Sequence, residues 1–148
     1  MSVAARGNLA EIATGHLAQK KSDNEQVKSF GERMVKDHSA TNDQLTALAR
    51  NLDIKLPQKP SRRDENRMKK LEGMSGTKFE TAYAHDMIRD HRADIHAFER
   101  EAEHGTNPEV KQFAQSTLPT LKEHLSLAEQ LPGEHRAASA AGTPPAER

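Results

Sequence analysis

Along most of this chain, apolar residues recur at intervals of three and four positions, with polar residues between them. This spacing places the apolar side chains on one face of an α-helix, and the strict alternation typical of a strand does not occur. The pattern predicts four long helices and a short helix before the third of them, at about 2–20, 24–52, 61–73, 77–104 and 108–131. The chain is therefore expected to be all-α.

The connections between the predicted helices determine how they are arranged. Few residues join the first long helix to the second and the third to the fourth, so each pair should form an antiparallel hairpin. About 24 residues separate the second and third long helices, which is enough to travel the length of a bundle. A four-helix bundle with one long crossover is the ferritin-like arrangement, in which the second and third long helices run parallel. This fold should occupy residues 1–131, and the small, polar, Pro-rich segment 132–148 is expected to be a disordered tail.

The sequence Met-x-x-Asp-His occurs in both of the helices expected to run parallel, once from Met34 to His38 and once from Met87 to His91. Each histidine follows the predicted start of its helix by 14 residues. At a rise of about 1.5 Å per residue, the two histidines therefore lie at about the same height. His124, in the last helix, falls within about one turn of that height. The sequence thus predicts a layer of the bundle to which three helices each contribute a histidine.

Helical wheels, drawn at about 100° per residue, indicate which of these groups face the core. Asp94 lies almost at the centre of the apolar stripe of its helix. The first helix is ambiguous, because His16 lies on its apolar face whereas Glu11 points away from it. The acidic and histidine side chains predicted to face the core from the other helices are Asp37, His38, Asp90, His91, Asp94 and His124.

Imidazole and carboxylate groups that face each other in a bundle core suit a borderline divalent metal such as Zn, Fe or Mn. Asp94 in particular needs a partner, because a carboxylate buried alone is costly. A carboxylate beside a ligand can also accept the imidazole proton and orient the ring, the role expected for Asp37 and Asp90. Glu11 or His16 would close the site from the first helix. The expected metal ligands are His38, His91, Asp94, His124 and Glu11.

Two other interpretations of the predicted layer stay open. The first is a structural or interaction protein in which the histidines and aspartates form a metal-free polar layer that fixes the register of the helices. The second is a metal-dependent oxidase, which requires an open coordination position. The sequence contains no nucleophile motif, no phosphate loop, and no pair of inward Glu-x-x-His motifs of the di-iron type. Binding is therefore expected rather than catalysis.

Composition narrows the choice of partners. The 22 basic residues are balanced by 22 acidic ones, which argues against nucleic-acid binding. No apolar run approaches the roughly 20 residues that a membrane span needs, and the absence of Cys excludes disulfides and thiolate ligands. The start, "MSVAARGNLAEIA", has no apolar core of a signal peptide. The expected partner is a metal ion, and a homodimer stays open.

Four segments carry a resemblance to a known family: "NLAEIATGHLAQKK", "VKSFGERMVKDHSATNDQL", "FETAYAHDMIRDHRADIHAFEREA" and "VKQFAQSTLPTLKEHL". With the "LP" at Leu56-Pro57, they occur in the order typical of the bacterial domain-of-unknown-function 4142 family. The resemblance covers about residues 7–131. Members are ferritin-like proteins, often labelled as outer-membrane or exported proteins, and no reaction is attached to the family.

The resemblance implies a four-helix ferritin-like fold and an envelope- or stress-associated role. It implies a periplasmic or otherwise exported location if a leader has been removed, with the cytoplasm as the alternative. Glu11 matches the family pattern, whereas Ala13 stands where an acidic residue is common, which leaves a ligand from the first helix in question. The other recurrent positions of the family are Asp37, His38, Asp90, His91, Asp94 and His124.

Overall fold

The computed structural model describes residues 1–132. Their regular structure is helical throughout, which confirms the prediction of an all-α protein. The helices are α1 (Ser2–Lys21), α2 (Glu25–Asn51), α3 (Arg62–Glu72), α4 (Gly76–His104) and α5 (Pro108–Glu129). None of the helices in this part of the chain is long and apolar enough to cross a membrane. The tail predicted at 132–148 lies, apart from Pro132, outside the described residues.

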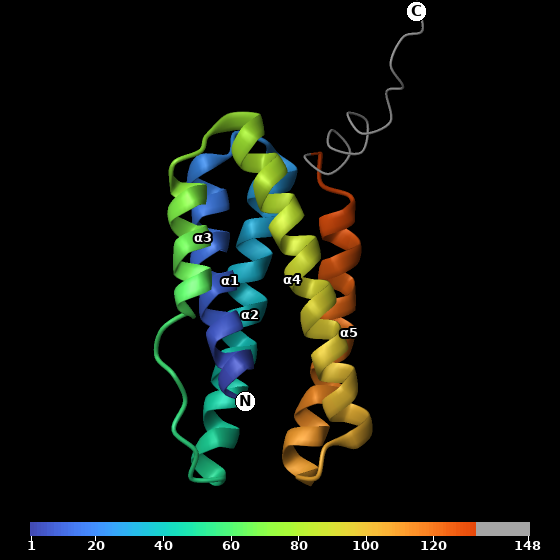
Figure 1. The fold of residues 1–148 in the computed structure, drawn as a ribbon. Helices are drawn as coiled ribbons and strands as arrows, with labels where there is room; N and C mark the ends of the chain where they lie inside the picture. Colours follow the sequence, from blue (N-terminus) through green and yellow to red (C-terminus); the bar gives the residue numbers. More distant parts are fainter. Residues whose placement is uncertain (133–148) are drawn as a thin grey trace, which may run out of the picture.

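The four long helices form a bundle made of two antiparallel hairpins (Figure 1). One hairpin consists of α1 and α2, and the other of α4 and α5. Because the crossover returns along the length of the bundle, α2 and α4 run in the same direction, while α1 and α5 run in the opposite one (Figure 1). The short helix α3 lies within the crossover and packs against α1 and α4. The predicted four-helix bundle with a long crossover is confirmed.

Side-chain caps define where three of the helices begin. Asn24 Oδ1 accepts hydrogen bonds from the backbone N–H groups of Gln26 and Val27, and Asn107 Oδ1 binds the first turn of α5 in the same way. Ser61 Oγ accepts from the backbone N–H of Asp64 at the start of α3. Such caps satisfy backbone donors that the helix itself leaves free. They thereby fix the height at which each helix presents its side chains.

The apolar core lies directly beside the predicted histidine layer. Its aromatic centre is Tyr83, which stacks on Phe79 at 5.7 Å between ring centroids and meets Phe30 edge-on at 5.9 Å. Met34 and Met87 are fully buried next to it. Each methionine precedes a histidine by four residues, about one helical turn. The histidines therefore form the layer that follows the apolar core.

Helix α1 turns a different face inward from the one that its apolar residues predict. The apolar residues that recur at helical spacing along it are only partly buried, namely Leu9, Ile12, Ala13 and Leu17. The residues that it buries are Ala5, Asn8, Glu11, Thr14, Gly15 and Ala18. The wheel assignments of this helix were therefore wrong, since His16 is exposed and Glu11 is only 3% exposed.

The close crossing of α1 and α2 explains this orientation. A Cβ atom built on Gly15 would lie 2.7 Å from the carbonyl oxygen of Gly31, and one on Gly31 would lie 2.7 Å from that of Gly15. Only glycine lets two helix backbones approach so closely. The pair of glycines thus sets the rotation of α1, and its polar face then points at the histidine layer.

Candidate metal centre

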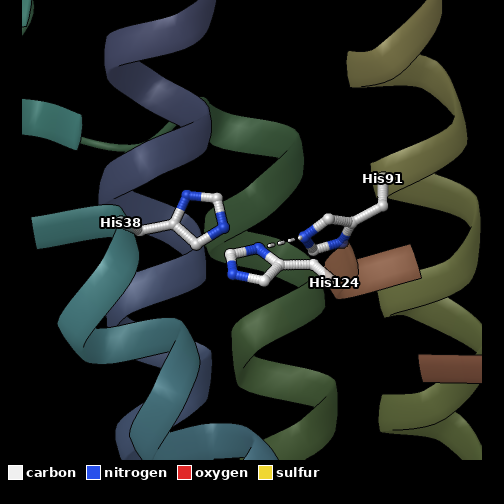
Figure 2. A group of neighbouring side chains, drawn as sticks. All are labelled: His38, His91 and His124. Carbon is white, nitrogen blue, oxygen red and sulfur yellow. Dashed lines mark hydrogen bonds between the residues drawn. The ribbon is translucent and has the colours of Figure 1, made fainter. Parts of the chain in front are cut away.

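Three buried histidines from three helices meet in the bundle: His38 of α2, His91 of α4 and His124 of α5 (Figure 2). Their ring centroids are 5.2 to 5.6 Å apart, and none is more than 3% exposed. One ring nitrogen from each histidine lies within 4.8 Å of those of the other two. The structure thus brings together in one layer the three histidines that the sequence placed at the same height.

The second nitrogen of each ring is held by an oxygen atom outside the group. His91 Nδ1 lies 2.8 Å from the carbonyl oxygen of Met87, and His38 Nδ1 lies 2.9 Å from Asn8 Oδ1. His124 Nε2 lies 2.7 Å from Asp37 Oδ2. These oxygens are acceptors, so each of the three ring nitrogens carries the proton and donates. In a neutral imidazole the opposite nitrogen then carries a lone pair.

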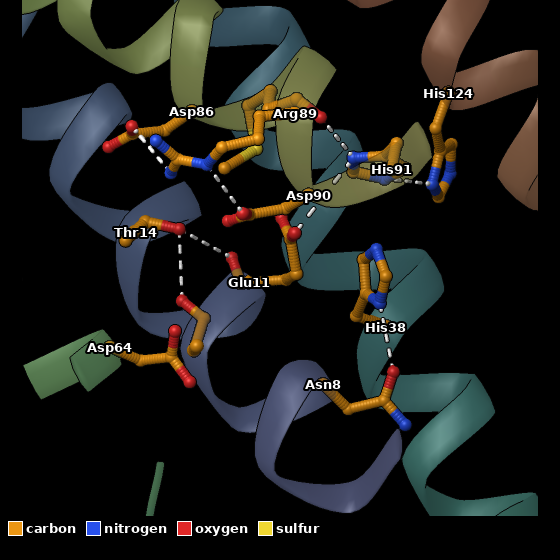
Figure 3. Close-up of polar contacts among 12 residues, drawn as sticks. Asn8, Glu11, Thr14, His38, Asp64, Asp86, Arg89, Asp90, His91 and His124 are labelled. Atoms are coloured by element: carbon orange, nitrogen blue, oxygen red, sulfur yellow. Dashed lines mark hydrogen bonds and ion pairs between the residues drawn. The ribbon is translucent and has the colours of Figure 1, made fainter. Parts of the chain in front are cut away.

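The nitrogens that carry these lone pairs face one another. His91 Nε2 and His124 Nδ1 are 3.3 Å apart, although in these tautomers neither has a proton to donate to the other. His38 Nε2 is buried without a hydrogen-bond partner among the described residues. Figure 3 shows it turned away from Asn8, toward the side on which His91 lies. Three buried acceptors thus converge on one place.

The separation of 3.3 Å between His91 Nε2 and His124 Nδ1 matches the geometry of a metal site. Zinc binds imidazole nitrogen at about 2.0–2.1 Å in a tetrahedral arrangement, so two such ligands lie about 3.3 Å apart. A cation at this place would engage these two lone pairs, and a ring nitrogen of His38 lies within 4.8 Å of both. The arrangement therefore has the residue types and the spacing required to hold one ion.

Burial keeps the three rings in the neutral form that binds metals. It lowers the pKa of His91 to about 4, with a further contribution from the neighbouring His124. The pKa of His38 is lowered well below its usual value by burial and by the other two rings. Burial also lowers the pKa of His124, although the hydrogen bond to Asp37 opposes this. At neutral pH, no proton therefore needs to leave a ring before it can ligate.

Asp37 is placed to orient His124, because its carboxylate accepts the hydrogen bond from His124 Nε2. Burial alone would raise the pKa of Asp37, but its hydrogen bonds from His124 and Arg33 outweigh burial and lower it. Arg33 Nε lies 3.2 Å from Asp37 Oδ2, and its Nη2 lies 3.0 Å from Glu123 Oε2. The Asp37 carboxylate is therefore ionised and held between a guanidinium and the imidazole that it orients.

Asp90 occupies a different environment although it belongs to the same repeated motif. Its Oδ1 lies 2.9 Å from Arg67 Nη1 and 3.3 Å from Arg89 Nε. Among the described residues its hydrogen bonds go to these two arginines and not to an imidazole. The repeated Asp-His pair thus has two roles, because Asp37 reaches a histidine whereas Asp90 reaches the crossover helix.

Glu11 lies at the edge of the histidine group. Its Oε1 is 3.9 Å from His91 Nδ1, on the side of the ring that faces away from the other histidines (Figure 3). Its Oε2 is buried without a hydrogen-bond partner within residues 1–132. Burial, together with the charges of Asp94 and Asp90, raises the pKa of Glu11 well above its usual value. Glu11 therefore adjoins the three converging nitrogens but does not lie among them.

The other two predicted residues lie outside the group of three. Asp94 is partly buried and lines a neighbouring cavity with Glu11 and Asp90. Burial and the charges of Asp90 and Asp64 raise its pKa to about 7. His16 is exposed on α1. The structure thus separates the nitrogen donors from the carboxylates that the sequence had assigned to the same site.

Asn8 and the carbonyl of Met87 were not found from the sequence. Asn8 precedes Glu11 by three residues, so the two share a face of α1. A polar face on a bundle helix is the signal that could have revealed Asn8, but the helical wheel placed this face away from the apolar one. The Met87 carbonyl carries no sequence signal, because every residue has one.

Comparisons with known proteins agree with the fold. The family described as a domain of unknown function, DUF4142, matches residues 1–131. Among solved structures, the chain is similar to a protein from Streptomyces coelicolor that is provisionally described as a secreted DUF305 protein. The TM-score is 0.70 at 15% sequence identity, and 87% of each chain is covered. At this identity the likeness shows a shared helical fold and nothing more. No curated protein matches the chain.

Proposed function

The chain belongs to DUF4142, a family described as a domain of unknown function, and from the site itself we propose that the protein binds one divalent transition-metal ion. Its ligands are His38, His91 and His124. The observation that carries this proposal is the 3.3 Å contact between His91 Nε2 and His124 Nδ1, two buried nitrogens whose protons lie on the far side of each ring.

A metal ion resolves an electrostatic problem that the rings alone leave. Two facing lone pairs repel unless a proton or another cation lies between them. A shared proton would require one charged imidazole, and burial lowers the pKa of all three rings. Imidazole is a good ligand for Zn, Fe and Mn, and three protein ligands leave a further coordination position. Which metal ion binds depends on the ions available to the protein as well as on the ligands of this site.

Asp37 supports the ion through His124. A carboxylate that accepts the outer proton of a ligating imidazole fixes the tautomer and makes the ring a better donor. The distance of 2.7 Å between His124 Nε2 and Asp37 Oδ2 suits this role. Asn8 and the Met87 carbonyl hold His38 and His91 in the same manner, so each ligand has its own orienting oxygen.

We also propose an exported location and an envelope- or stress-associated role, and we propose no reaction. The description of the Streptomyces coelicolor relative as secreted supports export. The second candidate function is a structural protein whose histidines form a metal-free polar layer. The three outer hydrogen bonds favour it, since they satisfy one nitrogen of each ring without any ion. A metal-dependent oxidase ranks third, because nothing in the layer beyond its further coordination position points to redox chemistry.

A melting experiment separates metal binding from the metal-free layer. Zn²⁺ at about 100 times its dissociation constant stabilises a protein by about 2.7 kcal/mol, which corresponds to a rise in Tm of about 10 °C for a domain of this size. The rise should disappear with excess chelator and in His91→Ala. It should persist in His96→Ala, because His96 is exposed on the same helix. Equal melting temperatures with Zn²⁺ and with chelator would contradict metal binding and favour the structural protein with a metal-free polar layer.

A further inference from the structure

A second cluster of charged groups lies beside the histidines, around a cavity of about 340 Å³. The cavity is lined by α1, by the crossover with α3, and by α4. Its acidic lining residues are Glu11, Asp64, Asp90 and Asp94. These four residues come from three helices, so the fold gathers carboxylates that are far apart in the sequence.

Ion pairs and hydrogen bonds occupy two of the four carboxylates. Asp90 is bound by Arg67 and Arg89. Asp64 accepts a hydrogen bond from Ser61 Oγ and lies 4.0 Å from Arg67 Nη1. The two arginines of the lining that make these contacts, Arg67 and Arg89, are therefore themselves paired with acids. Both acids thus have partners within the protein, although their charges still raise the pKa of Asp94.

Glu11 and Asp94 are the two carboxyls of the lining that no arginine or hydroxyl binds, and the contact of Glu11 is the 3.9 Å between its Oε1 and His91 Nδ1. Glu11 Oε2 has no hydrogen-bond partner within residues 1–132, although only 3% of Glu11 is exposed to solvent. No hydrogen bond or ion pair joins the side chain of Asp94 to another residue of the same described range. The charge of Asp94 raises the pKa of Glu11 more than that of any other acid. A buried, unpartnered carboxyl beside a second one calls for a cation.

We propose that Glu11 and Asp94 bind a second cation in this cavity, a hydrated divalent ion that prefers oxygen ligands, such as Mg²⁺ or Mn²⁺. Ions of this class bind through one or two carboxylates and retain several waters. Six waters occupy about 180 Å³ at about 30 Å³ each, so a hydrated ion fits a space of 340 Å³. The site is distinct from the histidine nitrogens in position and in donor chemistry.

The remaining arginines of the lining do not compete for this position. Arg6 Nη1 lies 3.5 Å from the carbonyl oxygen of Lys59 and 3.4 Å from that of Pro60, so it is directed at the crossover backbone. Arg63 is exposed to solvent. With Asp64 and Asp90 paired, the charges of Glu11 and Asp94 are those that a divalent cation would neutralise. The carboxylates that the sequence assigned to the histidine site would then serve an ion of their own.

Binding of Mn²⁺, followed by electron paramagnetic resonance at pH 8, tests the proposal. The wild-type protein, first given one equivalent of Zn²⁺, should bind one Mn²⁺ per chain. Glu11→Gln and Asp94→Asn keep the side-chain shape and remove the charge, and each should weaken Mn²⁺ binding at least tenfold. Glu103→Gln should leave Mn²⁺ binding unchanged, because Glu103 is exposed on α4. Circular dichroism confirms that each variant is folded.

His38→Ala separates this proposal from the histidine site, since His38 has no contact with Glu11 or Asp94 among its hydrogen bonds and ring contacts. This variant should retain Mn²⁺ binding whether or not the wild-type histidines bind Zn²⁺. Wild-type protein that binds no Mn²⁺ would overturn the proposal. So would Mn²⁺ binding that is lost in His38→Ala but unchanged in both carboxylate variants.

Discussion

Replacing Asp94 by asparagine should stabilise the metal-free protein by an amount that grows with pH. Burial raises the pKa of Asp94 in the folded protein to about 7, against about 3.9 in an unfolded chain. The folded state therefore holds this proton more tightly, and the stability contributed by Asp94 falls as pH rises from about 4 to about 7. The slope is about 1.4 kcal/mol per pH unit while the folded carboxyl stays protonated. Between pH 5 and pH 8 the cost grows by about 2–3 kcal/mol.

Urea denaturation followed by circular dichroism at pH 5, 6, 7 and 8, with chelator present, measures this effect. The difference in unfolding free energy between Asp94→Asn and wild type should increase over this range by about 2–3 kcal/mol and level off above pH 7. Glu103→Gln is the control, since Glu103 is exposed on the same helix. Parallel pH profiles for wild type and Asp94→Asn would refute the assignment of Asp94 as a partly buried carboxyl without a counter-charge.

Three further predictions concern the packing of α1 and the histidine layer. Gly15→Ala should destabilise the protein by about 1–3 kcal/mol in urea denaturation, because its Cβ would meet the Gly31 carbonyl. Gly7→Ala should instead stabilise it by about 0.5–1 kcal/mol, because its Cβ meets nothing within 4 Å. Asp37→Ala should weaken Zn²⁺ binding about 10- to 100-fold in a competition titration with unchanged stoichiometry, and equal affinity would contradict the role of this carboxylate. Nitrogen NMR of the metal-free protein at pH 7 should find the proton on Nδ1 of His91 and on Nε2 of His124, and the opposite tautomers would remove the basis of the metal proposal.

The fold was predictable because its signals are local. Helix periodicity, the caps at Asn24 and Asn107, and the length of the crossover each act over a short stretch of chain. Together they fix the direction and height of each helix. The meeting of His38 with His91 followed from these quantities, since each histidine comes one turn after a core methionine and both helices run the same way.

The surroundings of the histidines could not be predicted in the same way, because they depend on contacts between distant elements. The rotation of α1 is set by the approach of Gly15 to Gly31, which a wheel of α1 alone does not contain. The arginine that pairs with Asp90 comes from the crossover helix, Arg67. The identical Asp-His motifs therefore do not indicate that Asp37 and Asp90 bind different partners.

Metal content tests the central claim most directly. The protein should be purified without an affinity tag, beside His91→Ala and the exposed-position control His96→Ala, and analysed for bound elements. The account predicts close to one transition-metal ion per chain at the histidines in wild type and in His96→Ala, and loss of that ion in His91→Ala. Wild-type protein that contains no transition metal and takes up none on reconstitution would contradict it, and would leave the three histidines as a polar layer of the core.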